Sequence, residues 1–416
     1  MKKKNAVIIG YDAISALGLD LQMQWQRALQ GQSGIGPLTR FELQDKFPIK
    51  IAGQSPEIDH LPYDFLKPRE QARWISPIYK YALLSVQRAL EKCGLKITPD
   101  LAPRVGITYS TAVGGLDAVL AADRKWIADS ALPLPCINPN SCINMVTGKV
   151  SMLTGATGPI SSTISACATG VTSMIVGAML LQLDQADVVL CGAVDFPLVE
   201  PIVAGFATMN AAYVPKEGAP QEPPAAASRP FSLGRRGFVI SEGAGAVILA
   251  SQEFAEAHGI DYNIGIRGWS MTSDAKHFVA PNYETVRRCI VESIARAGLA
   301  PQDIDAVNAH AASTRVGDKV EADALRSVFG DRVPPVTANK SLIGHAMGAA
   351  SAIESIYALL GMRDHMLPPT INYLEDPELP IDCVAEGKRA VNQTFVLKNA
   401  FGFGGCNACI VFENLK

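Results

Sequence analysis

The sequence lacks the features that mark membrane proteins and nucleic-acid-binding proteins. Its formal net charge is only −3 over 416 residues, so no strong field of either sign indicates a nucleic-acid or membrane partner. The apolar run after the first lysines, residues 6–9, is much shorter than a signal-peptide core. The longest apolar segment, near residues 171–183, contains polar residues and is too short to cross a bilayer. We therefore expect a cytoplasmic protein without nucleic-acid or membrane partners.

Cysteine usage gives no sign of a disulfide framework or a metal centre. Nine cysteines, an odd number in a chain of this length, fit a reducing compartment. Cys406 and Cys409 have C-x-x-C spacing, but they begin a strand-like run. Residues i and i+3 of a strand point to opposite faces, which suits neither metal binding nor a disulfide. We predict no metal site and no redox pair.

The composition and the order of apolar patterns predict an α/β protein. The chain is 48% apolar and 19% charged, as in a well-buried globular protein of two or three domain-sized units. Strand-like and helix-like patterns alternate along the chain, and this alternation restarts after residue 250. We therefore expect two halves, 1–250 and 251–416. Residues 214–230 have loop composition and are expected to form a surface excursion. Expected strands lie at 6–9, 104–108, 186–191, 244–250, 263–269 and 306–309, with a strand pair at the end. Expected helices lie at 21–29, 79–92, 171–181, 283–297, 319–329 and 349–360.

Cys167 occupies the most informative position in the sequence. Residues 158–165 are rich in β-branched side chains and predict a strand, and the apolar residues 171–181 predict a buried helix. A cysteine at such a strand-to-helix turn lies near unpaired helix N–H groups, whose partial positive charge favours a thiolate. The alternative is a small buried residue that packs between sheet and helix.

Two of the six histidines stand where α/β proteins place ligand-facing groups. His310 ends a strand-like run and opens a loop of small polar residues. His345 lies in a glycine-containing loop that also carries Lys340 and leads into a helix. Groups at the carboxyl ends of strands commonly face ligands. A histidine of this kind, considered alone, is more often a satisfied structural residue.

The combination of Cys167, His310, Lys340 and His345 resembles the β-ketoacyl-acyl-carrier-protein synthases, the condensing enzymes of the thiolase superfamily, and most of all the elongating fatty-acid type. The resemblance includes Ala-Cys-Ala-Thr-Gly at 166–170 and Gly-Phe-Gly-Gly at 402–405. Further matching blocks lie at 7–10, 15–18, 111–115, 229–232, 236–239, 242–245, 308–314 and 340–350. Together they span nearly the whole chain in the family's order.

The resemblance implies a thiolase-like duplicated αβαβα fold of five layers, a homodimer or heterodimer, and an acyl carrier protein as partner. It implies no cofactor other than the phosphopantetheine arm of that carrier. The implied reaction has two stages. Cys167 first takes an acyl group, and a malonyl-carrier protein then loses carbon dioxide to give a carbanion that attacks the acyl-cysteine. Two neutral imidazoles, His310 and His345, suit the enolate formed by decarboxylation, and Lys340 would supply a fixed charge.

The resemblance also implies roles for residues around these four. The backbone N–H groups of Cys167 and Phe403 would form an oxyanion hole, with Phe403 as a gate. Thr314, Val113 and Phe401 would line the substrate site. Glu321 and Glu354 would be structural, bracing Lys340 or a bound cation. A carrier-docking patch would comprise Lys67, Arg69, Arg73, Arg124 and Lys125, although a solvated helix face accounts for these charges as well.

Several positions depart from the family's pattern. Ala311 and Ala312 replace a glycine and a threonine after His310, and Val279 and Cys406 each stand where a threonine is usual. The loop at 210–213 lacks the usual arginine. A ketosynthase of a specialised polyketide or polyene pathway is therefore an alternative to the fatty-acid enzyme. A non-catalytic chain-length partner subunit, which usually lacks the cysteine, and a thiolase, which would need a second catalytic cysteine such as Cys406 or Cys409, are further alternatives.

Overall fold

A computed structural model describes residues 5–215 and 222–416 of the chain. Nine of its strands form one mixed sheet in the order β4-β5-β6-β1-β7-β13-β12-β8-β9. Their bounds are β1 (Ala6–Ile14), β4 (Val105–Ile107), β5 (Val188–Asp195), β6 (Gly243–Ser251), β7 (Ile264–Ser273), β8 (Ala306–Asn308), β9 (Val336–Thr337), β12 (Phe395–Gly402) and β13 (Cys406–Asn414). Two small sheets pair β2 (Ile35–Pro37) with β3 (Ile51–Gly53) and β10 (Met366–Leu367) with β11 (Arg389–Ala390).

Each of the six helices predicted from apolar periodicity and helix-ending residues overlaps an observed helix, while α2, α4, α5, α6, α8, α9 and α12 were not predicted. The predicted helix at 21–29 has the observed bounds, and α3 ends before Gly94, whose φ of +67° is left-handed. The α-helices are α1 (Leu21–Leu29), α2 (Pro68–Gln71), α3 (Pro77–Cys93), α4 (Leu116–Asp129), α5 (Ile137–Ser141), α6 (Met145–Thr154), α7 (Thr169–Gln182), α8 (Glu200–Thr208), α9 (Gln252–Ala257), α10 (Tyr283–Arg296), α11 (Arg315–Phe329), α12 (Lys340–Ile343) and α13 (Met347–Asp364).

The strand order is repeated on the two sides of the β1–β7 junction. On one side β4 is parallel to β5, and β5, β6 and β1 follow as antiparallel neighbours. On the other side β8 is parallel to β12, and β12, β13 and β7 follow in the same way. A short antiparallel pairing of Ala6–Ile8 in β1 with β7 joins the two parts. The predicted α/β class is confirmed, and a boundary between halves near residue 250 stays a prediction.

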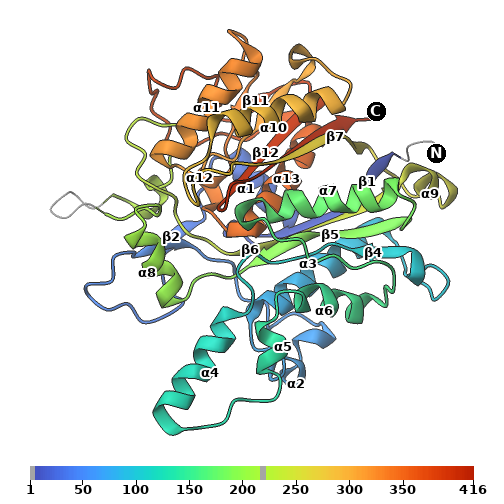
Figure 1. Cartoon of the computed structure of the whole chain (residues 1–416), viewed down its shortest axis with the longest axis vertical. Coiled ribbons are helices and arrows are strands. Elements are labelled where there is room, and N and C mark those ends of the chain that lie inside the picture. The colour runs from blue at the N-terminus through green and yellow to red at the C-terminus, as the bar shows by residue number, and fades with distance from the viewer. Residues whose placement is uncertain (1–4, 216–221) are drawn as a thin grey trace.

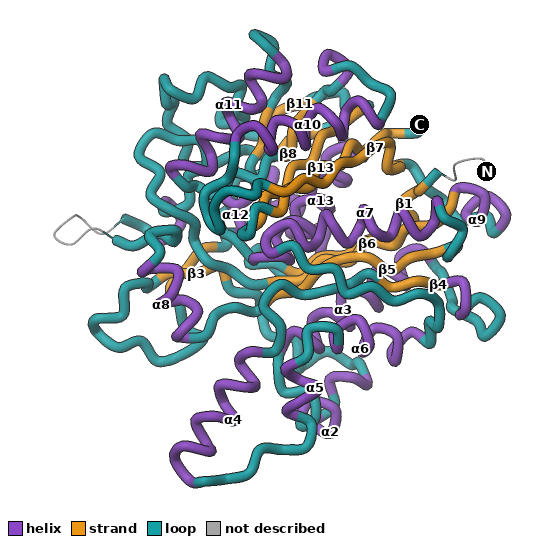
Figure 2. Tube along the Cα trace, in the orientation of Figure 1, coloured by secondary structure: helices purple, strands orange, loops and turns teal. Residues whose placement is uncertain are grey.

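The elements stack as five layers, which Figure 1 shows from top to bottom. Helices α10 and α11 cover the outer face of the β7–β13 part, and α3 covers the outer face of the β1–β6 part. Helices α7 and α13 pack against each other between the two parts of the sheet (Figure 2). Gly170 permits their close approach, since a Cβ there would lie 2.3 Å from the backbone nitrogen of Ala352. The first turn of each central helix therefore lies next to the other helix.

The predicted strand at 158–165 is wrong. Within this segment only Ile160 forms a bridge, with Ile107 of β4. Ile160 and Ile164 are 51% and 44% exposed, so part of the apolar surface of this segment is not packed against the sheet. Part of the predicted excursion at 214–230 falls on residues 216–221, which lie outside the described residues. In the described part of the chain, no helix is both long and apolar enough to cross a membrane.

Candidate active site

Cys167 lies on a tight 3₁₀ turn, Ala166–Ala168, that leads directly into α7. Ala166 has a φ of +49°, a left-handed conformation that is costly for an alanine and that turns the chain sharply before the nucleophile. The end of β12 presses against this turn at Gly402, where a Cβ would lie 2.3 Å from the Ser165 carbonyl oxygen. Only glycine fits there. The close contact brings the Gly402–Phe403 peptide beside the cysteine.

Burial raises the pKa of the Cys167 thiol to about 11. The positive charge of Lys340 and the backbone N–H groups of Phe403 and of Cys167 itself act in the opposite direction. Asp195 adds to the rise. The expectation that the helix start favours a thiolate in the free protein is therefore wrong, because desolvation of the charged sulfur outweighs the nearby positive groups. The two N–H groups converge on the sulfur, in the arrangement expected of an oxyanion hole.

This pKa predicts how alkylation of Cys167 depends on pH. A thiol reacts as its thiolate, so the rate with iodoacetamide rises about tenfold per pH unit from pH 7 to 10 and levels off only near the pKa. Rates are measured by intact mass and peptide mapping, beside a cysteine-containing reference peptide whose thiol has a pKa of about 8.5. A plateau for Cys167 already at pH 8 would contradict the buried, protonated thiol.

The two histidines lie in one pocket wall although they come from different elements. His310 follows β8, and its backbone N–H donates to Oε1 of Glu321 at 2.9 Å. His345 lies between α12 and α13, where its N–H donates to the Val239 carbonyl at 2.7 Å and its own carbonyl accepts from Ser241. The two rings meet edge to face, with centroids 5.6 Å apart. Backbone bonds on both sides therefore fix each imidazole.

Both imidazoles are neutral at pH 7. Burial lowers the pKa of His310 and of His345 well below the usual value, and the nearby charges of Lys340 and Lys398 lower both further. The Nδ1 atom of each ring is buried and has no hydrogen-bond partner among the described residues. A neutral imidazole has one N–H group that can donate a hydrogen bond to an anion. It does not carry the second, acidic proton of an imidazolium.

A buried pair of lysines lies behind the histidines. The Lys340 ammonium donates to Glu354 Oε1 at 2.5 Å and to the His310 carbonyl at 2.6 Å. The second oxygen of Glu354 accepts from Lys398 at 2.7 Å. Glu321 accepts instead from the backbone of His310 and Ala311 and from the Asn399 side chain. Glu354 thus contacts Lys340 directly, and Glu321 holds the loop that carries His310.

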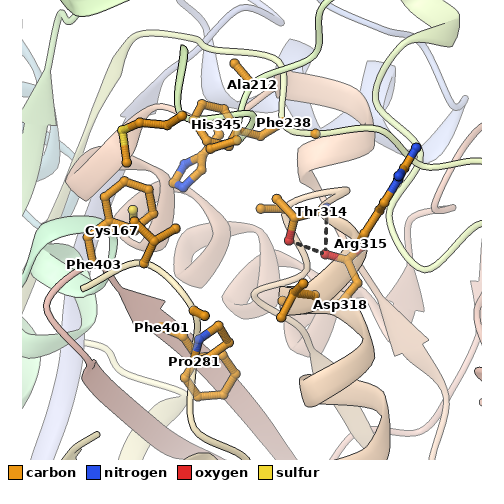
Figure 3. A pocket seen from close by; sticks show the side chains of 18 of the residues that line it. Cys167, Ala212, Phe238, Pro281, Thr314, Arg315, Asp318, His345, Phe401 and Phe403 are labelled. Atoms are coloured by element: carbon orange, nitrogen blue, oxygen red, sulfur yellow. Dashed lines mark hydrogen bonds between the residues drawn. The ribbon is translucent and has the colours of Figure 1, made fainter. Parts of the chain in front are cut away.

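A cavity of about 570 Å³ opens above these groups. Cys167, His310 and His345 reach its wall together with Thr314, Phe401 and Phe403. Figure 3 shows Cys167, Phe403 and His345 around the inner part of this cavity and Thr314, bonded to Asp318, farther along it. Mostly apolar residues line the remainder. The cavity can therefore admit a long, largely uncharged chain that ends at the sulfur.

Phe403 stands at a glycine-rich turn between β12 and β13. It is followed by Gly404 and Gly405, which have φ values of +79° and +73°. Its ring packs near Phe206, with centroids 6.2 Å apart. Val113 packs against the same apolar cluster as Phe403. Val113 is not among the residues that line the cavity, in contrast to the expectation that it lines the substrate site.

The five basic residues proposed for carrier docking lie on two separate elements. Lys67, Arg69 and Arg73 lie at or beside α2, and all three are exposed. Arg124 and Lys125 lie on the protruding α4, also exposed (Figure 1). Lys67 pairs with Asp64 and Arg124 with Glu200. None of the five lines the cavity, so they can contact only a partner's surface and not the reacting atoms.

Two charged residues that sequence patterns did not single out complete the site. Asp195, at the end of β5, accepts from the N–H groups of Ala112, Val113 and Gly348, so it ties the loop before α4 to the start of α13. Lys398 lies in the middle of β12, a position where a strand pattern predicts an apolar residue. Nothing in the sequence around Asp195 separates it from a surface aspartate, whereas an isolated lysine in an apolar strand was a detectable signal.

The C-x-x-C cysteines stand apart from the cavity. Cys406 begins β13 and Cys409 is buried, with its sulfur 3.2 Å from the Asn399 side-chain oxygen. Neither lines the cavity. All nine cysteines are free. The thiolase alternative lacks a second cysteine facing Cys167.

Comparisons with known proteins agree with this geometry. Residues 3–255 match the model of the "Beta-ketoacyl synthase, N-terminal domain", and residues 264–374 match that of the "Beta-ketoacyl synthase, C-terminal domain". A 3-oxoacyl-acyl-carrier-protein synthase 2 of Coxiella burnetii is 33% identical over the full length of both chains.

Two solved structures extend the comparison. A β-ketoacyl synthase from Burkholderia phymatum has a TM-score of 0.90 at 27% identity, covering 99% of this chain and 100% of that one. The ishigamide ketosynthase/chain length factor has a TM-score of 0.87 at 27% identity, with full coverage of both chains.

Proposed function

Because this chain belongs to the β-ketoacyl synthase family of condensing acyltransferases, we propose that Cys167 carries the acyl group and that His310 and His345 promote decarboxylation of the malonyl unit. The observation that carries this assignment is the convergence of one cysteine, two neutral imidazoles and two backbone N–H groups on a single apolar cavity. An acyl carrier protein would deliver both substrates on its phosphopantetheine arm, and the chain itself would need no other cofactor.

In the first stage the sulfur of Cys167 attacks the thioester carbonyl of an acyl-carrier protein. The N–H groups of Cys167 and Phe403 stabilise the negative charge that develops on that carbonyl oxygen. The carrier thiol leaves with the proton that the Cys167 thiol gave up. The acyl group then lies in the apolar cavity as a new thioester.

In the second stage the bond between the malonyl carboxylate and its α-carbon breaks, and carbon dioxide leaves. The electron pair passes into the thioester as an enolate, whose oxygen accepts hydrogen bonds from His310 and His345. The α-carbon then attacks the acyl-Cys167 carbonyl and a β-ketoacyl-carrier protein forms. The Cys167 sulfur leaves as a thiolate, which takes a proton from solvent to restore the thiol. Lys340 stays behind the histidines, bound to the His310 carbonyl.

Val279 makes the arm-binding region less polar than a threonine would. It lines the cavity near Thr314, and a threonine of nearly the same shape would add one hydroxyl. Val279→Thr should lower KM for the carrier-bound substrate about fivefold with kcat unchanged, since one hydrogen bond contributes about 1 kcal/mol. Steady-state kinetics test this, with Val291→Thr on the exposed face of α10 as the control. An unchanged KM would show that the arm does not pass this residue.

A specialised polyketide or polyene pathway is the second candidate for this condensing activity. It is supported by the missing hydroxyls at Val279 and Ala312 and by the likeness to the ishigamide ketosynthase/chain length factor. Incubation with a panel of saturated and polyunsaturated acyl-carrier proteins separates the two candidates. Preferential acylation of Cys167 by saturated chains supports the fatty-acid pathway, and preferential acylation by polyunsaturated chains supports the specialised one.

We also propose a dimer that acts in the cytoplasm. Large apolar side chains lie exposed on α4 and the segment after it, including Ile127 at 74% and Leu132 at 84%. Ile160 and Ile164 are exposed as well, and exposed apolar side chains of this kind are often covered by a partner subunit. Sedimentation velocity on the purified chain distinguishes a homodimer from a monomer that needs a different subunit.

A further inference from the structure

Lys398 is a buried charged residue that has no direct role in the reaction steps proposed above. It lies at the centre of β12, opposite Asn308 of β8 and Ile410 of β13, and its side chain is 0% exposed. A lysine is almost never fully buried unless it is paired. Its ammonium group contacts Glu354 Oε2 at 2.7 Å and the Ala309 carbonyl oxygen at 3.4 Å. Both contacts lie directly beneath the end of the strand that carries His310.

Glu354 is shared between two ammonium groups. Its other oxygen binds Lys340 at 2.5 Å, and the side chains of Glu354 and Lys340 are 0% and 1% exposed. The second buried carboxylate nearby, Glu321, uses its oxygens on backbone N–H groups and on Asn399. Two fixed positive charges therefore face one carboxylate, in a region closed to solvent.

We propose that Lys398 is a positioning residue of the decarboxylation step: its ammonium group holds Glu354 against Lys340 beneath the His310 strand and supplies a second fixed positive charge behind both imidazoles. The inference rests on the proposed role of the two histidines. Lys398 does not touch the substrate and acts through Glu354 and the Ala309 carbonyl.

The charges around the imidazoles explain what Lys398 does. The charges that act on the imidazoles are those of Lys340 from α12 and Lys398 from β12, and the two rings also act on each other. The buried carboxylates nearby are Glu354 of α13, which binds both ammonium groups, and Glu321 of α11, which binds the backbone of His310 and Ala311. Protonation of an imidazole would add a third positive charge beside the two ammonium groups. The Nδ1 atom of each ring is buried and has no hydrogen-bond partner among the described residues, so an N–H group formed there would have no acceptor. Lys398 thus keeps each imidazole neutral, with a single N–H to donate.

Lys398→Met and Lys398→Gln test this inference by removing the charge. Methionine keeps the length of the stem, and glutamine keeps a hydrogen-bond donor for Glu354, so the second variant serves if the first does not fold. The pH titration of the imidazole ¹⁵N resonances is followed in the full chain, with the signals assigned by His310→Gln and His345→Gln. Lys319→Met, on the exposed face of α11, is the matched control.

In the unmodified protein and in Lys319→Met we expect both imidazole midpoints to lie below the usual value of about 6.5. In each folded Lys398 variant, at least one midpoint should rise by about one pH unit or more, because a nearby positive charge is lost. The acid limb of malonyl-carrier-protein decarboxylation should move to higher pH by the same amount. Unshifted midpoints in a folded variant would overturn the inference, and so would an equal loss of kcat at every pH, which indicates packing alone.

A wrong role for Lys398 and wrong roles for the two histidines give different experimental results. If His310→Ala and His345→Ala leave decarboxylation intact, the histidine roles are wrong whatever the titrations show. If those variants lose decarboxylation while the imidazole midpoints ignore Lys398, only the part assigned to Lys398 is wrong.

Discussion

Cys167→Gln should lose condensation and acyl transfer by at least about 10³-fold, because it removes the only thiol among the described residues that line the cavity. The same variant should keep decarboxylating malonyl-carrier protein. The glutamine amide carbonyl can accept the N–H groups of residue 167 and Phe403, as the acyl thioester would, and the histidines remain in place. Acyl transfer is measured by mass spectrometry of the protein, and decarboxylation by release of carbon dioxide from malonyl-carrier protein.

Cys406→Ala is the matched control for that experiment. It removes a half-buried thiol outside the cavity, so acyl transfer should stay within about twofold of the unmodified protein. If Cys406→Ala lost acyl transfer while Cys167→Gln retained it, Cys406 and not Cys167 would be the nucleophile. If Cys167→Gln lost decarboxylation together with acyl transfer, the two stages would not be separable as proposed.

His310→Ala and His345→Ala should each lower the kcat of decarboxylation by about 10²- to 10³-fold, the usual cost of removing one hydrogen-bond donor from a buried developing anion. Acylation of Cys167 should fall much less, since its oxyanion is held by backbone N–H groups. Single-turnover acylation and malonyl decarboxylation, measured on the same preparations, give the two rates separately.

A control variant and two contrary outcomes test the roles of His310 and His345. His277→Ala, which changes a histidine at the outer part of the cavity, should leave decarboxylation within about threefold of the unmodified rate. Unchanged decarboxylation in both His310→Ala and His345→Ala would remove the enolate role from them. Equal losses of acylation and decarboxylation would instead point to a collapse of the cavity.

The parts of the fold predicted best were those with local signals. The helix of α3 was readable from its apolar periodicity and from Gly94, and the turn at Cys167 from the apolar helix that follows it. The candidate residues His310 and His345 were readable because each follows or enters a loop of small residues. His310 and His345 lie in the same wall of the cavity because strands far apart in the sequence pair in the sheet. No local sequence pattern encodes that pairing.

The parts that were missed depend on neighbours far away in the sequence. Residues 158–165 have strand composition, but only Ile107 offers a bridge to them. The helix start near Cys167 favours a thiolate locally, yet the packing of β12 and α13 around the sulfur buries it and reverses the direction of the pKa shift. The partner of Lys398 is Glu354, 44 residues away. Composition and spacing do not show which buried carboxylate a lysine will meet.

The most direct test of the central claim is to map the acyl group on the unmodified protein after incubation with an acyl-carrier protein. We expect one acyl group per chain, found on the peptide that contains Cys167, and we expect it to disappear as β-ketoacyl-carrier protein forms once malonyl-carrier protein is added. An acyl group on Cys406 or on another cysteine, or one on Cys167 that malonyl-carrier protein cannot discharge, would contradict the account.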